Sequence, residues 1–382
     1  MSPSLHSAHV AIIGAGIIGL SCAWELAQRG ARVTIYDTQP PGRGASWAAA
    51  GMLAPAYEAA AEEGAHPRLF DLCMESAALW PAFAASVSRA SGRNLGFSPG
   101  PSLALAFDGA EAASLHRLAA ALTRHGVESD MLLPEAVWDI EPAVSRGVHG
   151  ALRLPTDGQV DNRAIVAALI AALHAQASVR FVDGPAPLEE RKGRLCVEGH
   201  DMILAAAGWN TAAIKVRQHG EEFSLVNWDT ALDEIDCYGG QMLSVAREPG
   251  LPSMTLRCGG IYIAPKPDRV IIGATMEPGI VTDHADADTI AQLRGEAARL
   301  CPAIAGATEM ETWAGVRPGT LDHAPLLGAT LADGLYVASG HYRNGILLAP
   351  VTARIMADMM LDGTSGALAS TFSPARFAAA TA

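Results

Sequence analysis

Three side chains in the last third of the chain could together bind a carboxylate. Arg317 stands directly before Pro318-Gly319, which is predicted to form a turn; Arg343 lies in the glycine-rich run 340–345, and Tyr262 lies in an alternating apolar segment. A guanidinium fork next to a phenol suits carboxylate oxygens, and each charge-assisted hydrogen bond contributes about 1.5–3 kcal/mol. A single arginine is more often part of an ion pair, and a single tyrosine more often a packed strand residue. The combination beside glycine turns predicts an anion receptor.

A glycine motif near the start of the chain predicts a dinucleotide site. The run Val10-Ala-Ile-Ile-Gly14-Ala-Gly16-Ile-Ile-Gly19 is a short apolar strand followed by G-x-G-x-x-G. Gly14 permits a tight turn, Gly16 lets the backbone approach a pyrophosphate, and Gly19 allows close packing of helix on strand. Free N–H groups at the helix start attract phosphates, and Asp37 ends the second strand where a carboxylate binds a ribose diol. Three glycines alone are a weak signal, but this order favours dinucleotide binding over an unrelated glycine-rich turn.

Periodicity predicts the elements that position these residues. Apolar residues at three- and four-residue spacing predict helices, and alternation predicts strands. The predicted helices are 17–29 (ending at Gly30), 66–91, 111–125, 161–176 (capped by Asp161 or Asn162) and 346–361. The predicted strands are 10–13, 32–36, 179–182, 194–197, 202–208, 241–245, 260–265 and 269–276. This order predicts an α/β protein in which a parallel cofactor domain is interleaved with a mostly antiparallel substrate domain.

A chain of 382 residues is too long for one simple core, so two domains are expected. The cofactor domain is predicted to comprise 1–80, 150–213 and 321–382, and the substrate domain 81–149 and 214–320. Within the first, the small residues of 43–56 suit a backbone that runs close to a flat ring system. An alanine-rich helix start is the alternative interpretation of that segment.

Composition excludes several classes of protein. A net charge of −13 argues against nucleic acid and anionic membrane as partners. The six cysteines and twelve histidines show no metal-ligand spacing, so neither a metal site nor a disulfide framework is predicted, and reduced thiols fit a cytoplasmic protein. The apolar start is interrupted by glycines and preceded by no Lys or Arg, so neither a signal peptide nor a membrane span is expected. Asp322-His323 and the stretch from Asp157 to Asp161 are interpreted as turn and cap residues.

Nearly the whole chain resembles the D-amino-acid oxidase superfamily of flavoproteins, and within it the thiamine-pathway glycine oxidases. The resemblance implies a glutathione-reductase-2 type of fold with a Rossmann-like FAD-binding domain. The matching segments are Ile12-Ile-Gly-Ala-Gly-Ile-Ile-Gly19, Ala48-Ala-Ala-Gly-Met-Leu53, Tyr262-Ile-Ala-Pro265, Gly273-Ala-Thr-Met276, Trp313-Ala-Gly-Val-Arg-Pro-Gly-Thr320 and Gly340-His-Tyr-Arg-Asn-Gly-Ile-Leu-Leu-Ala-Pro350.

The resemblance also assigns roles to residues. Arg317 would bind the substrate carboxylate, Tyr262 would hydrogen-bond to it, and Arg343 would lie at the edge of flavin and substrate. These three are the predicted catalytic residues. Met276 would line the substrate pocket, and Glu58 would lie on an entrance segment; both are predicted to bind substrate together with those three.

The resemblance implies that FAD binds noncovalently. Sarcosine oxidases attach their flavin to a cysteine in the stretch around Arg317, and this chain has no cysteine there. A helix starting near Gly345 would direct its positive dipole at the flavin. The predicted cofactor-binding residues are Gly14, Gly16, Ile17, Ile18, Gly19, Asp37, Arg43, Ser46, Ala49, Ala50, Gly51, Met52, Ala186, Ala207, Gly208, Trp209, Arg317, His341, Tyr342, Arg343, Asn344, Gly345, Ile346 and Leu347.

The implied activity is amine oxidation by hydride transfer from glycine-like or small D- or N-methyl amino acids to flavin. The products would be an imine, then a 2-oxo acid and ammonia, with molecular oxygen converted to hydrogen peroxide. The resemblance further implies a role in thiamine thiazole synthesis and a homotetramer. Two alternatives are an FAD-dependent D-amino-acid dehydrogenase with another acceptor and a non-catalytic FAD-binding subunit of a larger oxidase complex.

Two segments depart from the family pattern. Glycine oxidases can place a histidine two residues before the strand tyrosine, where this chain has Gly260. The residues Cys237-Tyr-Gly239-Gly240 replace a Pro-Val-Lys/Arg-Gly-like turn, so a basic residue expected near the flavin is missing or moved. This second departure, within 214–240, is the feature that favours the non-catalytic alternative.

Overall fold

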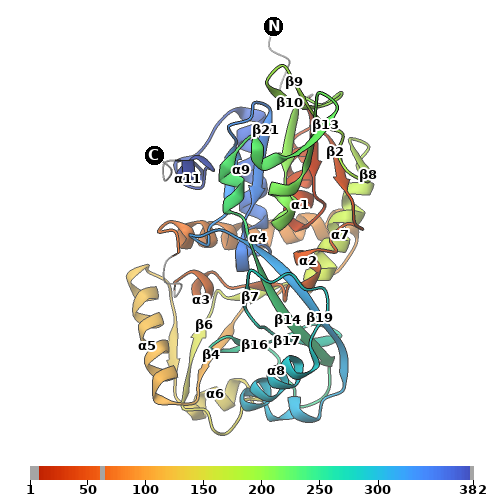
Figure 1. The fold of residues 1–382 in the computed structure, drawn as a ribbon. Helices are drawn as coiled ribbons and strands as arrows, with labels where there is room; N and C mark the ends of the chain where they lie inside the picture. Colours follow the sequence, from red (N-terminus) through yellow and green to blue (C-terminus); the bar gives the residue numbers. More distant parts are fainter. Residues whose placement is uncertain (1–7, 61–64, 379–382) are drawn as a thin grey trace.

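A computed structural model describes residues 8–60 and 65–378 of the chain. Figure 1 shows one large sheet in the upper half of the molecule and a second in the lower half. The long helix α4 (Leu69–Ser91) crosses between them.

The first sheet has the strand order β20-β21-β11-β1-β2-β8, and every neighbouring pair is parallel except β20–β21. Side chains of β1 alternate between two cores: Val10 and Ile12 lie in one, and Ala11 and Ile13 in the other. Burial on both faces is typical of a parallel sheet. Its strands are β1 (His9–Ile13), β2 (Arg32–Asp37), β8 (Val179–Asp183), β11 (Met202–Ala205), β20 (Leu326–Ala329) and β21 (Leu335–Ser339). Helices α1 (Ile17–Gln28), α7 (Asn162–His174) and α9 (Ala349–Asp362) contribute to the first of these cores.

The second sheet is antiparallel except for the pair β4–β15. Its strands are β4 (Ser102–Ala106), β5 (Asp130–Leu132), β6 (Gly150–Leu154), β14 (Asp236–Ala246), β15 (Thr255–Cys258), β16 (Ile261–Pro265), β17 (Arg269–Gly273), β18 (Glu277–Pro278) and β19 (Glu309–Gly319). Helices α5 (Gly109–Arg124), α6 (Pro134–Ile140) and α8 (Ala287–Leu300) pack on it. The predicted α/β class, a parallel sheet interleaved with a mostly antiparallel one, is confirmed.

The strands β14 and β19 form the longest ladder of the second sheet. It pairs Asp236 with Gly319 at one end and Ser244 with Glu311 at the other, followed by a bulge. The prediction that Pro318-Gly319 forms a turn is wrong, because both residues continue β19. Proline is tolerated there because β14 is the one partner of β19 among the described strands, which leaves β19 at a sheet edge.

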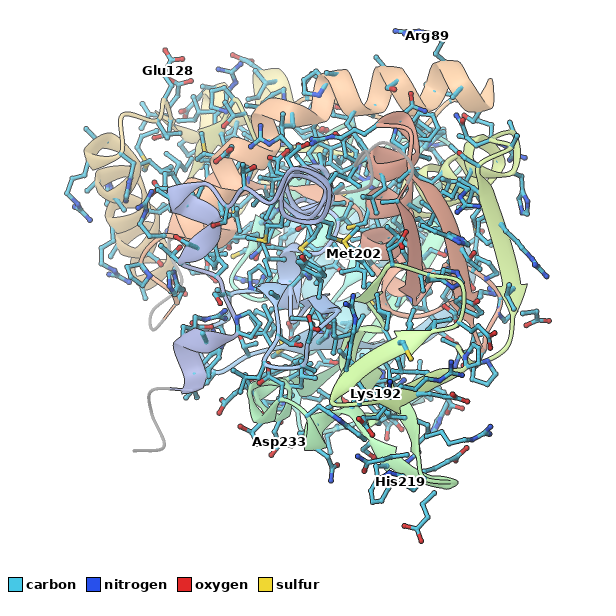
Figure 2. All side chains as sticks on the ribbon, turned by 90° about the horizontal axis from the view of Figure 1, so that it is seen from above. Arg89, Glu128, Lys192, Met202, His219 and Asp233 are labelled. Atoms are coloured by element: carbon cyan, nitrogen blue, oxygen red, sulfur yellow. The ribbon has the colours of Figure 1, made fainter. Side chains whose placement is uncertain are left out.

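Residues 214–235 pack on the first sheet. The hairpin of β12 (Lys215–Gln218) and β13 (Glu221–Ser224) joins that of β9 (Leu188–Arg191) and β10 (Arg194–Val197) in a small sheet. Lys192 and His219, with φ of 57° and 50°, start the two-residue turns of these hairpins, and both lie far from α4 in Figure 2. Val216, Leu225, Leu232 and Ile235 share a core with Ala11 and Ile13.

The predicted domain limits remain a proposal, and packing favours two changes to them. Residues 214–235 belong with the first sheet on the basis of their shared core. The limit between residues 80 and 81 falls inside α4, where Trp80, Ala84 and Val87 all lie in the core of the first sheet.

Most predicted helices are confirmed, with Asp161 capping α7 through the N–H groups of Arg163 and Ala164. The last helix begins at Ala349 rather than 346, with Pro350 in its first turn, where a missing N–H costs nothing. The strand predicted over 202–208 ends at Ala205, and that over 269–276 ends at Gly273. The remaining elements include α2 (Ala45–Ala48), β3 (Met52–Leu53), α3 (Pro55–Ala60), β7 (Gly158–Gln159), α10 (Ala367–Ser370) and α11 (Ala375–Ala378).

None of the helices in the described ranges is long and apolar enough to cross a membrane. Within the same ranges, no group of three or more His, Cys, Asp or Glu side chains is arranged to hold a metal ion.

Candidate active site

One long cavity of about 750 Å³ runs between the two sheets. This volume falls within the range of cofactor and ligand sites, roughly 300–1,000 Å³. The lining comes from the turn after β1, the segment 36–52, the turns after β8 and β11, the strands β14, β16 and β19, and the segment 338–346. The cavity therefore joins the glycine motif to the predicted carboxylate receptor.

The glycine turn, residues 14–19, is closely packed. Gly14 has a φ of +111°, and a Cβ there would overlap the carbonyl oxygen of Ala206. A Cβ on Gly19 would overlap the carbonyl oxygen of Gly14, whereas one on Gly16 would lie 3.3 Å from Ser46 Oγ. The predicted steric roles of Gly14 and Gly19 are confirmed.

Two side chains hold the N–H groups at the start of α1. Ala15 N–H donates to Asp37 Oδ2 at 2.7 Å, and Ile17 N–H donates to Ser46 Oγ at 2.8 Å. Asp37 thus lies at the end of β2 beside the glycine turn, where the sequence placed a ribose ligand.

The small residues of 43–52 also permit close approach. A Cβ on Gly51 would overlap the carbonyl oxygen of Val160, and one on Gly315 would overlap the Cβ of Ala48. Only the four residues of α2 are helical here, so the alternative of an alanine-rich helix start is limited to Ala45–Ala48.

All but two of the predicted cofactor residues line the cavity. The exceptions are Gly19, packed beneath the glycine turn, and Leu347, whose side chain is buried in the core. The carbonyl oxygen of Leu347 accepts hydrogen bonds from Ser76 Oγ at 2.6 Å and Trp80 Nε1 at 2.8 Å, so it faces α4. The roles of the other residues toward FAD remain predictions.

Arg317 reaches the cavity from β19 over two glycines of β14. Its Nη1 donates to the carbonyl oxygens of Gly239 at 3.2 Å and Thr275 at 3.4 Å. A Cβ on Gly240 would overlap Nη1 and lie 2.8 Å from Nη2. The unusual Gly239-Gly240 pair therefore makes room for the predicted substrate-binding cation.

Arg317 has no carboxylate partner among the described residues. Burial lowers its pKa, with Tyr262 opposing the shift and Arg343 adding to it, but an arginine remains a cation at neutral pH. A buried cation of this kind favours an anionic ligand.

Tyr262 lies beside it on β16, directly opposite Gly273 on β17. A Cβ on Gly273 would overlap the Tyr262 hydroxyl, so the glycine permits the ring to occupy this site. Burial raises the pKa of the phenol, which therefore remains a neutral hydrogen-bond donor.

Glu58 is buried and contacts two arginines. Its Oε2 lies 2.8 Å from Arg343 Nη2, and its Oε1 accepts from Arg257 Nη1 at 2.6 Å. Burial alone would raise the pKa of Glu58, but Arg343 and Arg257 lower it below its ordinary value. Glu58 forms part of the cavity wall, and its position on an entrance segment stays a prediction. We name the group of Tyr262, Arg317, Arg343 and Glu58 the charged wall.

Met276 lines the cavity and is partly exposed. The Tyr342 hydroxyl donates to Met276 Sδ at 3.4 Å, and the Tyr342 ring stacks on His323 with 4.5 Å between centroids. Asp322 instead pairs with Arg376 at 2.8 Å, in agreement with a turn role rather than a catalytic Asp-His pair.

His341 is buried at the cavity next to the start of α9. Its Nε2 lies 3.0 Å from Thr352 Oγ1, and burial lowers its pKa to about 3. The imidazole is therefore neutral at physiological pH.

Sequence reasoning missed Arg257 and the position of Asp157. Arg257 is almost completely buried, and its guanidinium carbon lies 4.7 Å from the centre of the Tyr57 ring. Asp157 accepts the N–H groups of Ala56 and Tyr57, each at 3.0 Å, at the start of the helix that carries Glu58. The one signal for Arg257 is a charge inside the short strand Thr255–Cys258.

Comparisons with known proteins place the chain among flavin-dependent enzymes. Residues 9–359 match the family DAO, FAD dependent oxidoreductase. The chain is 33% identical to a glycine oxidase of Geobacillus kaustophilus over 93% of each sequence. The crystal structure of glycine oxidase from that organism superposes with a TM-score of 0.83 and 30% identity, covering 97% of this chain and 99% of the other. A bifunctional protein ThiO/ThiG of Trichormus variabilis is 32% identical, and the match covers 96% of this chain but 55% of that protein.

Proposed function

The chain belongs to the DAO family of FAD-dependent oxidoreductases, and we propose that this FAD-dependent amino-acid oxidase acts on glycine and similarly small amino acids. One observation carries the proposal: Arg317 and Tyr262 line one cavity with the glycine turn, and Arg317 has no carboxylate partner in the described parts of the chain. A substrate carboxylate would supply that partner.

The residues present fit FAD. The glycine turn lies at the start of α1 next to Asp37, where the positive end of the helix dipole favours phosphates, and the exclusion of a Cβ at Gly14 and Gly19 shows how closely the backbone is packed. The segment 43–52 and the segment 341–346 would hold the flavin end. None of the residues that line the cavity is a cysteine, which supports noncovalent binding.

Bound FAD supplies a hydride acceptor for the α-carbon of an amine. Arg317 binds the substrate carboxylate and Tyr262 donates a second hydrogen bond to it, so the α-carbon has a fixed position. Met242, Ala48 and Ala274 make the neighbouring wall apolar and exclude water. Positioning and charge complementarity are the main contributions of the protein, and no protein acid or base is required.

The range of substrates is proposed to include sarcosine, D-alanine and D-proline. Gly260 lines the cavity, and a Cβ there would meet no atom within 4 Å. Another side of the pocket is bounded by the partly exposed Met276 rather than by a closed wall. A substituent on nitrogen or on the α-carbon therefore has space.

Molecular oxygen is the proposed electron acceptor, with hydrogen peroxide, glyoxylate and ammonia as final products from glycine. The imine formed first is the product proposed to serve thiamine thiazole synthesis, which the ThiO/ThiG and glycine oxidase relatives support. A cytoplasmic homotetramer remains part of this proposal.

The test is the visible spectrum of the purified protein under anaerobic conditions, followed by admission of air. Flavin bands should bleach when glycine is added and return in air with formation of peroxide. Bands that bleach but return slowly in air would instead indicate a dehydrogenase with another acceptor. Bands unchanged by glycine, sarcosine and D-alanine would overturn the proposed function.

The observation that favoured a non-catalytic subunit has a structural explanation. The residues Gly239-Gly240 replace the expected basic turn but accommodate the Arg317 guanidinium. The altered segment is thus compatible with a complete carboxylate site.

A further inference from the structure

Arg257 is a buried cation that the proposed reaction does not use. It extends from β15, directly opposite Tyr262 in the β15–β16 ladder, but is not part of the cavity lining. Its side chain is 2% exposed. Among the described residues, its Nε and Nη2 have no hydrogen-bond partner.

Such an arginine is poorly explained by stability alone. Burial of a guanidinium is energetically unfavourable, and one ion pair with incomplete hydrogen bonding often fails to offset that cost. Arg257 does bind Glu58, and Glu58 in turn contacts Arg343 at the cavity. Arg257 is therefore connected to the cavity through Glu58.

Glu58 links two cations from distant parts of the chain. Its Oε1 binds Arg257 Nη1 at 2.6 Å, and its Oε2 lies 2.8 Å from Arg343 Nη2. Each oxygen of the Glu58 carboxylate therefore contacts one guanidinium group. Without Arg257, both oxygens could turn to Arg343 and draw it from its position in the wall.

The charges explain why this arrangement matters for an anionic substrate. The negative charge of Glu58 faces two guanidinium groups, so it lowers the positive potential beside Arg317 and Tyr262 less than it would without Arg257. Removal of Arg257 would take away one of these cations and make the cavity less favourable for an anion.

We propose that Arg257 is a positioning residue that, through Glu58, sets the orientation and effective charge of Arg343 and so controls the affinity of the cavity for a carboxylate. The inference rests on the proposed function. It adds a residue outside the cavity to the determinants of substrate binding.

The test uses the FAD-loaded enzyme and acetate, a carboxylate that cannot be oxidised as an amine. The dissociation constant of acetate is measured from the change it causes in the flavin spectrum, between pH 5.5 and 8.5. Arg257→Gln should weaken acetate binding about tenfold at pH 8, and Arg257→Lys should restore most of the loss. The KM for glycine should rise more than kcat falls.

The pH dependence of acetate binding distinguishes an effect of the Glu58 charge from a structural effect of the substitution at Arg257. In Arg257→Gln, Glu58 loses a cation and its pKa rises, so lowering the pH protonates it and should recover acetate binding. Asp157, with a pKa raised by burial to about 6 against the opposing effect of Arg257, titrates in the same window. The variant Glu58→Gln retains Asp157 but has no carboxyl group at position 58. Its pH profile therefore gives the contribution of Asp157 alone. Within the described parts of the chain, the charged and titratable groups that face Glu58 are Arg257, Arg343, Arg317, Asp157, Tyr57 and Tyr262.

Two further variants complete the design. Arg269→Gln removes another buried arginine, paired with Asp161 at 3.2 Å outside the cavity, and should lower thermal stability without changing acetate affinity. In the double variant Arg257→Gln/Glu58→Gln, loss of Arg257 should change acetate affinity by less than twofold relative to Glu58→Gln, since its route of action is gone.

Acetate binding by Arg257→Gln equal to that of the wild type would overturn the inference while leaving the proposed function intact. Simple multiplication of the two single effects would overturn it as well. A wild-type protein that binds no carboxylate would overturn both proposals. If Arg257→Gln fails to fold, the neutral variant Arg257→Met, alone and combined with Glu58→Gln, decides the question on the same readouts.

Discussion

The glycine turn and the charged wall face the same cavity but are built in opposite ways. The turn uses backbone from one continuous segment, with its packing limited by Gly14 and Gly19. The wall uses side chains from four segments, in which Glu58 meets Arg343 across 285 residues of sequence (343 − 58). A local backbone structure tolerates few changes of shape, whereas a wall of ion pairs tolerates changes of shape better than changes of charge.

The largest effect is expected at the glycine turn. Gly19→Val places side-chain atoms where the Gly14 carbonyl oxygen lies, so the purified protein should contain little or no flavin. Gly16→Ala, with its Cβ 3.3 Å from Ser46 Oγ, should retain more. The measurement is the ratio of flavin to protein absorbance. Full flavin content in Gly19→Val would show that the glycine turn tolerates a side chain at position 19.

The charged wall should separate substrate binding from cofactor binding. Arg317→Ala should raise the KM for glycine about tenfold or more, equivalent to at least ~1.4 kcal/mol, with flavin content preserved. Arg299→Ala, which removes an arginine paired with Glu111 outside the cavity, is the matched control and should keep the wild-type KM. Steady-state oxygen consumption measures both, and an unchanged KM in Arg317→Ala would remove Arg317 from the site.

Asp157 supports the helix that carries Glu58 of the charged wall, and its titration should make the free energy of unfolding depend on pH. The glycine turn has no such dependence, because its backbone N–H groups do not titrate. Burial raises the pKa of Asp157 from 3.8 to about 6, so the folded protein favours the protonated form. This contribution is complete below pH ~4 and is lost as the pH rises through 6, by about 3 kcal/mol as an order of magnitude. The melting temperature of the wild type relative to Asp157→Asn should therefore fall between pH 4 and 7. A constant difference would contradict the raised pKa.

The smallest effect tests a glycine that belongs to the wall. Gly240→Ala would displace the Arg317 guanidinium and should raise the KM severalfold while leaving flavin content unchanged. Gly295→Ala, in α8 with open space around its Cβ, is the matched control and should stabilise the helix by up to about 1 kcal/mol. Equal KM values for the two variants would show that Arg317 can move without loss.

Sequence predicted what is local. The glycine turn, its helix and Asp37 follow one another within 37 residues, and their steric logic can be read from residue types alone. The family assignment and the α/β class were confirmed for the same reason, because both depend on contiguous motifs.

Contacts between segments that lie far apart in the sequence were harder to predict. Arg257 and Glu58 are 199 residues apart, and an arginine in a short strand carries no sequence signal of its partner. Gly239-Gly240 was interpreted as a departure from a family pattern, and only the β14–β19 register reveals that Arg317 occupies the space above it. Pro318-Gly319 was predicted as a turn because the free edge of β19 cannot be inferred from composition.

The bulge of the β14–β19 ladder has a consequence for changes in chain length. Ser244 pairs with Glu311 and Val245 with Glu309, so Met310 is the extra residue, and strict alternation holds from there to Arg317. A single-residue insertion or deletion between the bulge and Arg317 would turn that side chain to the opposite face of the sheet. Viable relatives should therefore vary in length on the far side of Met310, and keep a constant count of residues between Glu311 and Arg317.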